Sequence, residues 1–136
     1  MSEDSLPQPV RQLITERIDS VVQLEVLLLL ARDAARVWSA HDVSQTLRID
    51  ENWAAGELST LSGRALAGAT AVEGGAAAYR YAPGSADLDA AVQALAKSYA
   101  DRRVAVVAFI FSKPLDKIQT FADAFRIRGK GGKQDA

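Results

Sequence analysis

The chain has 136 residues, of which 49% are hydrophobic and 24% are charged, a composition typical of one globular domain with its own core. It contains no cysteine, which excludes disulfides and thiolate metal sites. Its net charge of −1 differs from the basic charge of most dedicated DNA-binding domains.

Residues 1–9 are polar and acidic, and they lack the basic and apolar regions of a signal peptide. The longest apolar runs, 26–31 and 104–111, are far shorter than the ~18 residues of a membrane span. We therefore expect a cytoplasmic protein with a flexible N-terminus and no membrane contact. The abundance of alanine and the preference for arginine over lysine indicate a bacterial source.

Two helices are predicted in the first quarter of the chain. The first occupies residues 10–20, and the second begins at residue 21, after a capping box of Ser20 and Gln23, and runs to about residue 35. The second helix is apolar almost all round, which is typical of a helix buried on most sides. The apolar stripe of the first helix is formed by Val10, Leu13, Ile14 and Ile18.

A helix-turn-helix is predicted next. Ser39 and Asp42 form a capping box for a short helix over 40–47. Asp50 is a good N-cap for a second helix over 51–62. Apolar residues at spacings of four and three predict that one face of this second helix is buried. Those residues are Ala54, Leu58 and Leu61.

A β-hairpin follows the second helix. Its strands are predicted over 69–72 and 79–81, around a turn at Glu73–Gly75. Period two places the two tyrosines of the second strand on one face and Arg80 on the other. Together with the apolar helix before them, these elements give residues 21–83 the order of a winged helix-turn-helix.

The C-terminal third is predicted to be helical. A long helix covers 86–112, although the apolar, partly β-branched run 104–111 also fits a buried strand. Helix is favoured there because no turn signal separates this run from the preceding pattern. A last helix is predicted over 115–128, and the basic tail 129–136 is expected to be flexible.

The helices over 10–20 and 84–128 carry more apolar surface than one small winged helix needs. Symmetric association is the usual way to bury such stripes, so we expect a homodimer. The predicted fold class is thus mainly α (α+β), a winged helix-turn-helix with one hairpin wing and added dimerisation helices at both ends. The candidate dimer contacts are Leu13, Ile14, Leu95, Tyr99, Phe109, Phe121 and Phe125.

An apolar first helix, a tryptophan at a helix start and an aromatic wing strand form a recognisable pattern. Its residues are Leu24–Leu30, Trp38-Ser39, Leu47-x-Ile49, Leu58-x-x-Leu61 and Tyr79-Arg80-Tyr81. In this pattern residues 21–83 resemble the winged-helix domain of small bacterial regulators of the MarR, PadR and ArsR groups. The resemblance implies a DNA-binding dimer whose helix over 51–62 enters the major groove. The positions so implied are Asn52, Trp53, Gly56, Glu57, Ser59, Thr60 and, in the wing, Arg80 or the 73–75 tip.

The charge of this region is unusual for a DNA-binding surface. Residues 37–82 contain three arginines against five acidic residues, a net charge of −2, whereas residues from Arg126 onward carry +3. The three arginines either contact phosphates or are solvated surface residues. They are Arg48, Arg64 and Arg80.

The polar residues Asn52, Ser59 and Thr60 are candidates for contacts with base edges. Trp53 could stack on a partner, but packing against the neighbouring helix is the favoured interpretation.

The leading functional hypothesis is a winged-helix transcriptional regulator that binds double-stranded DNA as a homodimer. The alternative is a protein-interaction module, in which the acidic and aromatic face of the 51–62 helix binds a protein partner. The sequence shows no catalytic motif, and we expect no enzyme activity, no cofactor and no metal.

Overall fold

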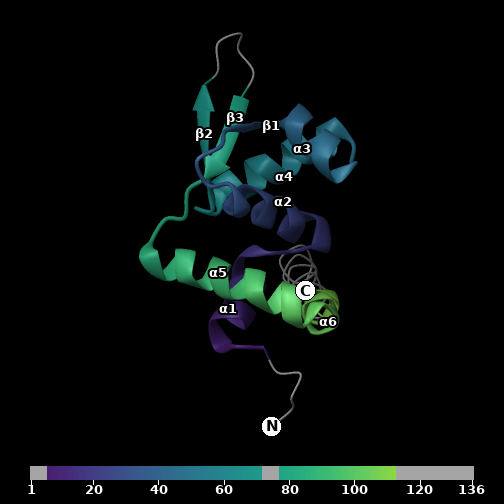
Figure 1. Cartoon of the computed structure of the whole chain (residues 1–136), viewed down its shortest axis with the longest axis vertical. Coiled ribbons are helices and arrows are strands. Elements are labelled where there is room, and N and C mark those ends of the chain that lie inside the picture. The colour runs from purple at the N-terminus through teal and green to yellow at the C-terminus, as the bar shows by residue number, and fades with distance from the viewer. Residues whose placement is uncertain (1–5, 72–76, 113–136) are drawn as a thin grey trace, which may run out of the picture.

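The computed structural model describes residues 6–71 and 77–112. In chain order its elements are α1 (Gln8–Arg17), α2 (Val21–Arg32), β1 (Trp38–Ser39), α3 (Ala40–Leu47), α4 (Glu51–Gly63), β2 (Ala67–Ala71), β3 (Ala77–Tyr81), α5 (Ala86–Asp101) and α6 (Arg103–Ser112). Figure 1 shows two halves: α2, α3, α4 and the sheet lie in the upper half, and α1, α5 and α6 lie in the lower half.

The starts of α3 and α4 are as predicted. The Ser39 hydroxyl accepts the Asp42 backbone N–H at 3.0 Å, and the Asp42 carboxylate accepts the Ser39 N–H at 3.1 Å. The Asp50 carboxylate accepts the Trp53 N–H at 3.1 Å. Each cap satisfies N–H groups that the first helical turn leaves without a partner inside the helix.

The cap of α2 differs from the prediction in one detail. The Ser20 hydroxyl accepts the Gln23 N–H at 3.1 Å, as expected. The Gln23 side chain, however, accepts the N–H of Asp19 at 2.9 Å rather than that of Ser20. The second hydrogen bond of the predicted capping box, the one accepted by the Gln23 side chain, therefore comes from Asp19, one residue earlier in the chain than expected.

Loss of the α3 cap gives a first testable effect. Ser39→Ala removes the acceptor for the Asp42 N–H, and we expect the free energy of unfolding to fall by about 1 kcal/mol. Urea denaturation measures this change. Ser59→Ala is the matched control, because Ser59 is exposed inside α4 and alanine favours helix there. Equal stability of the Ser39→Ala variant and the wild type would show that this cap is dispensable.

The sheet has three antiparallel strands in the order β1-β3-β2. The predicted hairpin is confirmed, and Ala69 pairs with Tyr79, although β2 and β3 each begin two residues before their predicted starts. Strand β1 was not predicted. Trp38, recognised from the sequence as a residue at a helix start, also pairs with Tyr79 on the side of β3 that faces away from β2. The predicted turn at Glu73–Gly75 lies outside the described residues.

The prediction of one long helix over 86–112 is wrong. Arg102 adopts φ −138° and ψ 53°, which separates α5 from α6. Its N–H closes α5 by donating to the Ser98 carbonyl at 2.6 Å. The segment 104–111 is helical, as favoured, and the break directs Val106 and Ile110 of α6 into the core.

The lower half of the protomer covers part of the apolar surface from which the homodimer was predicted. Helix α1 packs against α5 and α6 of the same chain, because each presents an apolar stripe that the other covers. Leu13, Ile14 and Leu95 are therefore buried within the protomer. Tyr99 and Phe109 are partly buried against the same core.

The last predicted helix, with Phe121 and Phe125, and the basic tail lie outside the described residues. In the part of the chain that is described, no helix combines the length and the apolar character needed to cross a membrane.

Candidate nucleic-acid interface

One face of α4 packs on the domain and the opposite face is open. Ala54, Leu58 and Leu61 are buried, as their spacing predicts. On the opposite side, Asn52, Gly56 and Ser59 are exposed at the same helical spacing. A side chain added at Gly56 would meet open space. This stripe of small and polar groups lets another surface approach the helix closely. We call Asn52, Gly56 and Ser59 the α4 stripe.

Trp53 flanks the α4 stripe, and the prediction that it packs in the core is wrong. Its side chain is 49% exposed, because its place on the helix lies beside the buried face. The indole N–H donates to the Glu57 carboxylate at 3.1 Å, one turn further along α4. The ring thus lies along the helix with an apolar face in solvent.

The acidic groups on α4 have partners within the domain. The Asp50 carboxylate is used as the helix cap. Glu51 lies 3.3 Å from the His41 ring nitrogen Nδ1 on α3. Glu57 accepts from the Gln23 amide at 2.9 Å as well as from Trp53. The acidic residues are therefore held to the sides of the helix, while the α4 stripe itself has no charged side chain.

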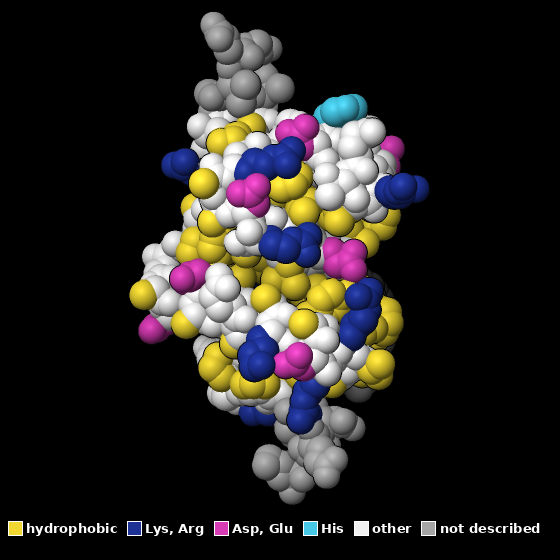
Figure 2. All heavy atoms as spheres, viewed as in Figure 1, with side chains coloured by type: hydrophobic (Ala, Val, Ile, Leu, Met, Phe, Trp, Pro, Cys, Tyr) yellow, Lys and Arg dark blue, Asp and Glu magenta, His cyan; other side chains and the backbone are white. Residues whose placement is uncertain are grey.

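Two of the three candidate arginines are exposed. Arg48 lies in the turn between α3 and α4 with a left-handed φ of 60°, and Arg80 lies on the wing strand β3. Figure 2 shows that basic side chains are separate and mixed with acidic ones on the face in view. The described surface in this view thus carries isolated cations rather than a continuous basic patch.

Arg64 is directed inward. At the end of α4, its guanidinium donates to the Asp19 carboxylate at 2.8 Å and to the Arg17 carbonyl at 2.7 Å. A longer contact of 3.3 Å reaches the Gln23 carbonyl oxygen. Arg17 in turn donates to the Arg64 carbonyl. These contacts tie the end of α4 to the α1–α2 junction, so the Arg64 guanidinium is engaged within the domain rather than directed toward solvent.

The wing strand is also tied to the lower half. The Tyr81 hydroxyl donates to the Asp89 carboxylate of α5 at 2.6 Å. Burial and the neighbouring Asp89 carboxylate raise the pKa of Tyr81, so the phenol remains a neutral donor at physiological pH. Tyr79 and Tyr81 both pack on the core, as strand tyrosines commonly do.

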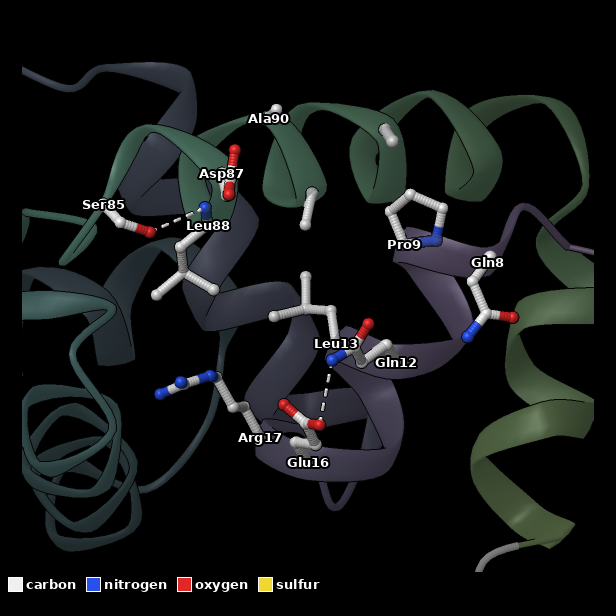
Figure 3. Close-up of a pocket in the computed structure, with 12 residues that line it drawn as sticks. Gln8, Pro9, Gln12, Leu13, Glu16, Arg17, Ser85, Asp87, Leu88 and Ala90 are labelled. Atoms are coloured by element: carbon white, nitrogen blue, oxygen red, sulfur yellow. Dashed lines mark hydrogen bonds between the residues drawn. The ribbon is translucent and has the colours of Figure 1, made fainter.

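A cavity of about 500 Å³ lies between α1 and α5. In Figure 3, Leu13 and Leu88 point into it, and Gln12 and Glu16 of its rim are hydrogen-bonded to each other at 3.1 Å. Arg17 also lines this cavity, although its guanidinium is bonded to Arg64. Across residues 6–71 and 77–112, no group of three or more His, Asp or Glu side chains is arranged to hold a metal.

The observed element order, an apolar helix, a helix-turn-helix and a hairpin, defines a winged helix-turn-helix with β2 and β3 as its wing. The predicted fold class is therefore confirmed. No protein-family model matches the chain, and no curated protein matches it.

Two solved structures are similar over most of their length. One is a double mutant of ZitR from Lactococcus lactis, with 14% identity, a TM-score of 0.47, and coverage of 84% of this chain and 77% of that one. The other is the adhesin competence repressor AdcR from Streptococcus pyogenes, with 12% identity, a TM-score of 0.47, and coverage of 85% of each chain.

Proposed function

We propose that the protein is a transcriptional regulator that binds duplex DNA with α4 in the major groove. The observation that carries this proposal is the α4 stripe, an exposed and uncharged row on the second helix of a helix-turn-helix. Small residues allow a helix to lie deep in the groove, and the Asn52 amide can form two hydrogen bonds with adenine. Ser59, with Thr60 beside it, supplies further hydroxyl groups.

Arg48 and Arg80 are the proposed phosphate contacts. Both are exposed, and they lie before α4 and on the wing, where the backbone of a bound duplex passes in winged helices. Two cations in each protomer neutralise few phosphates, and affinity rises with that number. A homodimer would double the number of phosphates neutralised, and the proposed DNA-binding form is therefore a homodimer.

The described surface suggests a revised place for the dimer contacts. On α6, Val104 and Phe111 are exposed at 83% and 66% of their surface. They lie seven residues apart, hence on one face of the helix. We propose that this face of α6 forms the homodimer contact. A monomer at micromolar concentration in sedimentation velocity would contradict this proposal.

Salt dependence tests the DNA contacts. We expect binding to a pool of random-sequence duplexes to weaken with salt, and Arg48→Ala and Arg80→Ala each to reduce the log–log salt slope by about 1 for each phosphate that the arginine neutralises. Fluorescence anisotropy across a salt series measures the slope. Lys97→Ala is the matched control, since Lys97 lies on α5 and is paired with Asp101. Slopes unchanged in both arginine variants would contradict the proposed docking.

A protein partner is the second candidate, and the half-exposed ring of Trp53 favours it. Large aromatic side chains are common energetic centres of protein interfaces. In this case the Trp53 ring would contact a basic protein, assisted by Glu51. Absence of duplex binding at low salt, together with Trp53-dependent binding of a basic protein, would replace the DNA proposal with this one.

A further inference from the structure

A continuous chain of hydrogen bonds joins the α1–α2 junction to Trp53. Arg64 contacts Asp19 and Gln23, Gln23 donates to Glu57 at 2.9 Å, and Glu57 accepts the indole N–H of Trp53. Gln23 is only 4% exposed, so its amide is fixed by packing as well as by hydrogen bonds. Partners of a buried amide have little freedom to move, and the chain therefore orients the Glu57 carboxylate.

The consequence for Trp53 is a surface side chain with a fixed direction. An exposed tryptophan normally samples several rotamers and loses that freedom when a partner binds. Here the indole N–H is already held by Glu57, and about half of the residue is exposed to solvent. A pre-oriented apolar surface beside the α4 stripe is suited to recognition of an apolar group.

The major groove of DNA offers one apolar group on the base edges, the C5-methyl of thymine. Resting on the proposed function, we propose that Trp53 contacts thymine methyl groups and thereby favours thymine-containing sites. In this proposal Trp53 is a specificity-determining residue. Gln23 and Glu57 are positioning residues, which act through the indole and do not touch the DNA.

The experiment compares two versions of the same random-sequence duplex pool, one amplified with dTTP and the other with dUTP, which removes every thymine methyl. We expect the wild type to bind the dTTP pool more tightly, by about fourfold for each methyl buried. In Trp53→Ala the ratio of the two affinities falls to about one. Trp53 is a surface residue, so this variant keeps the fold, and circular dichroism checks that it does.

The positioning residues are tested with a conservative pair. Glu57→Ala removes the acceptor of the indole N–H, and we expect the dTTP/dUTP affinity ratio to fall toward one. Glu57→Gln keeps an oxygen acceptor, and we expect its dTTP/dUTP affinity ratio to stay close to that of the wild type. An independent readout is the indole N–H resonance of Trp53, assigned by its absence in Trp53→Ala. It moves upfield in Glu57→Ala, because the hydrogen bond to the carboxylate is removed, and stays near its original position in Glu57→Gln.

The outcomes separate the two proposals. Equal binding of both pools by the wild type overturns the methyl contact and leaves the proposed function standing. An unchanged dTTP/dUTP affinity ratio in Trp53→Ala also overturns the proposed methyl contact of Trp53, because another residue then contacts the thymine methyl. Binding to neither pool at low salt overturns the proposed function itself, and the inference with it. An unchanged indole resonance in Glu57→Ala refutes the positioning roles alone.

Discussion

Leu95→Ala is expected to lower the free energy of unfolding by about 2–5 kcal/mol. The Leu95 side chain has 0% exposure and lies on α5 within the single core that joins both halves of the molecule. Truncation removes three buried carbon atoms and leaves a cavity that the surrounding helices fill only in part. Urea denaturation at one fixed protein concentration measures the loss.

Lys97→Ala is the control for this loss. Lys97 lies on the same helix, α5, and its side chain is 81% exposed, so its truncation should change the stability of the protomer by no more than about 0.5 kcal/mol. The same comparison, repeated at a lower protein concentration, tests whether Leu95 packs in the core of its own protomer. If Leu95 contacted a second copy instead, its effect would vanish on dilution to the monomer, and the assignment of Leu95 to the protomer core would be wrong.

Arg64→Ala should lower the free energy of unfolding by about 2 kcal/mol, the value typical of hydrogen bonds to charged groups. The guanidinium is the donor shared by Asp19, the Arg17 carbonyl and Gln23, and it is only 31% exposed. Its removal leaves these partly buried acceptors without that donor. The measurement is again urea denaturation.

Two further variants show whether the geometry of Arg64 matters. Arg64→Lys keeps the charge but not the planar fork that reaches three acceptors, and it should recover less than half of the loss. Arg80→Ala is the matched control, because Arg80 is an exposed arginine of the same domain, and it should change stability by no more than about 0.5 kcal/mol. Equal losses in Arg64→Ala and Arg80→Ala would refute the structural role of Arg64.

Helices whose starts depend on residues close together in the sequence could be predicted from the sequence. Helix α3 has the predicted bounds, because its start depends on Ser39 and Asp42, which are three residues apart. The N-cap of α4 at Asp50 and the buried face behind it follow from the same short-range rules. The α4 stripe was therefore visible in the sequence as the positions opposite the buried face.

The errors concern residues whose conformation depends on distant partners. Arg102 carries no turn signal, and the break there lets α6 pack against both α5 and α1. Arg64 was grouped with the surface arginines because its acceptors lie more than 40 residues away, near Asp19. Trp53 is a different case, because its size favours a core position, yet the Glu57 carboxylate that accepts its indole N–H lies only four residues further along the same predicted helix.

The hydrogen bonds that join the upper and lower halves of the protomer have a consequence for the spacing of the DNA half-sites that a dimer would recognise. Arg64 joins the end of α4 to the α1–α2 junction, and Tyr81 joins the wing to α5. Helix α4 and the wing are thus attached to elements that include α1 and α5, and these two helices pack against α6, the helix proposed to form the dimer contact. Dimers of this kind recognise half-sites about 34–36 Å apart, one turn of the double helix. In the proposed dimer the lower helices therefore set the phase between the two half-sites, and a small rotation at α6 would change which spacing of base pairs is recognised.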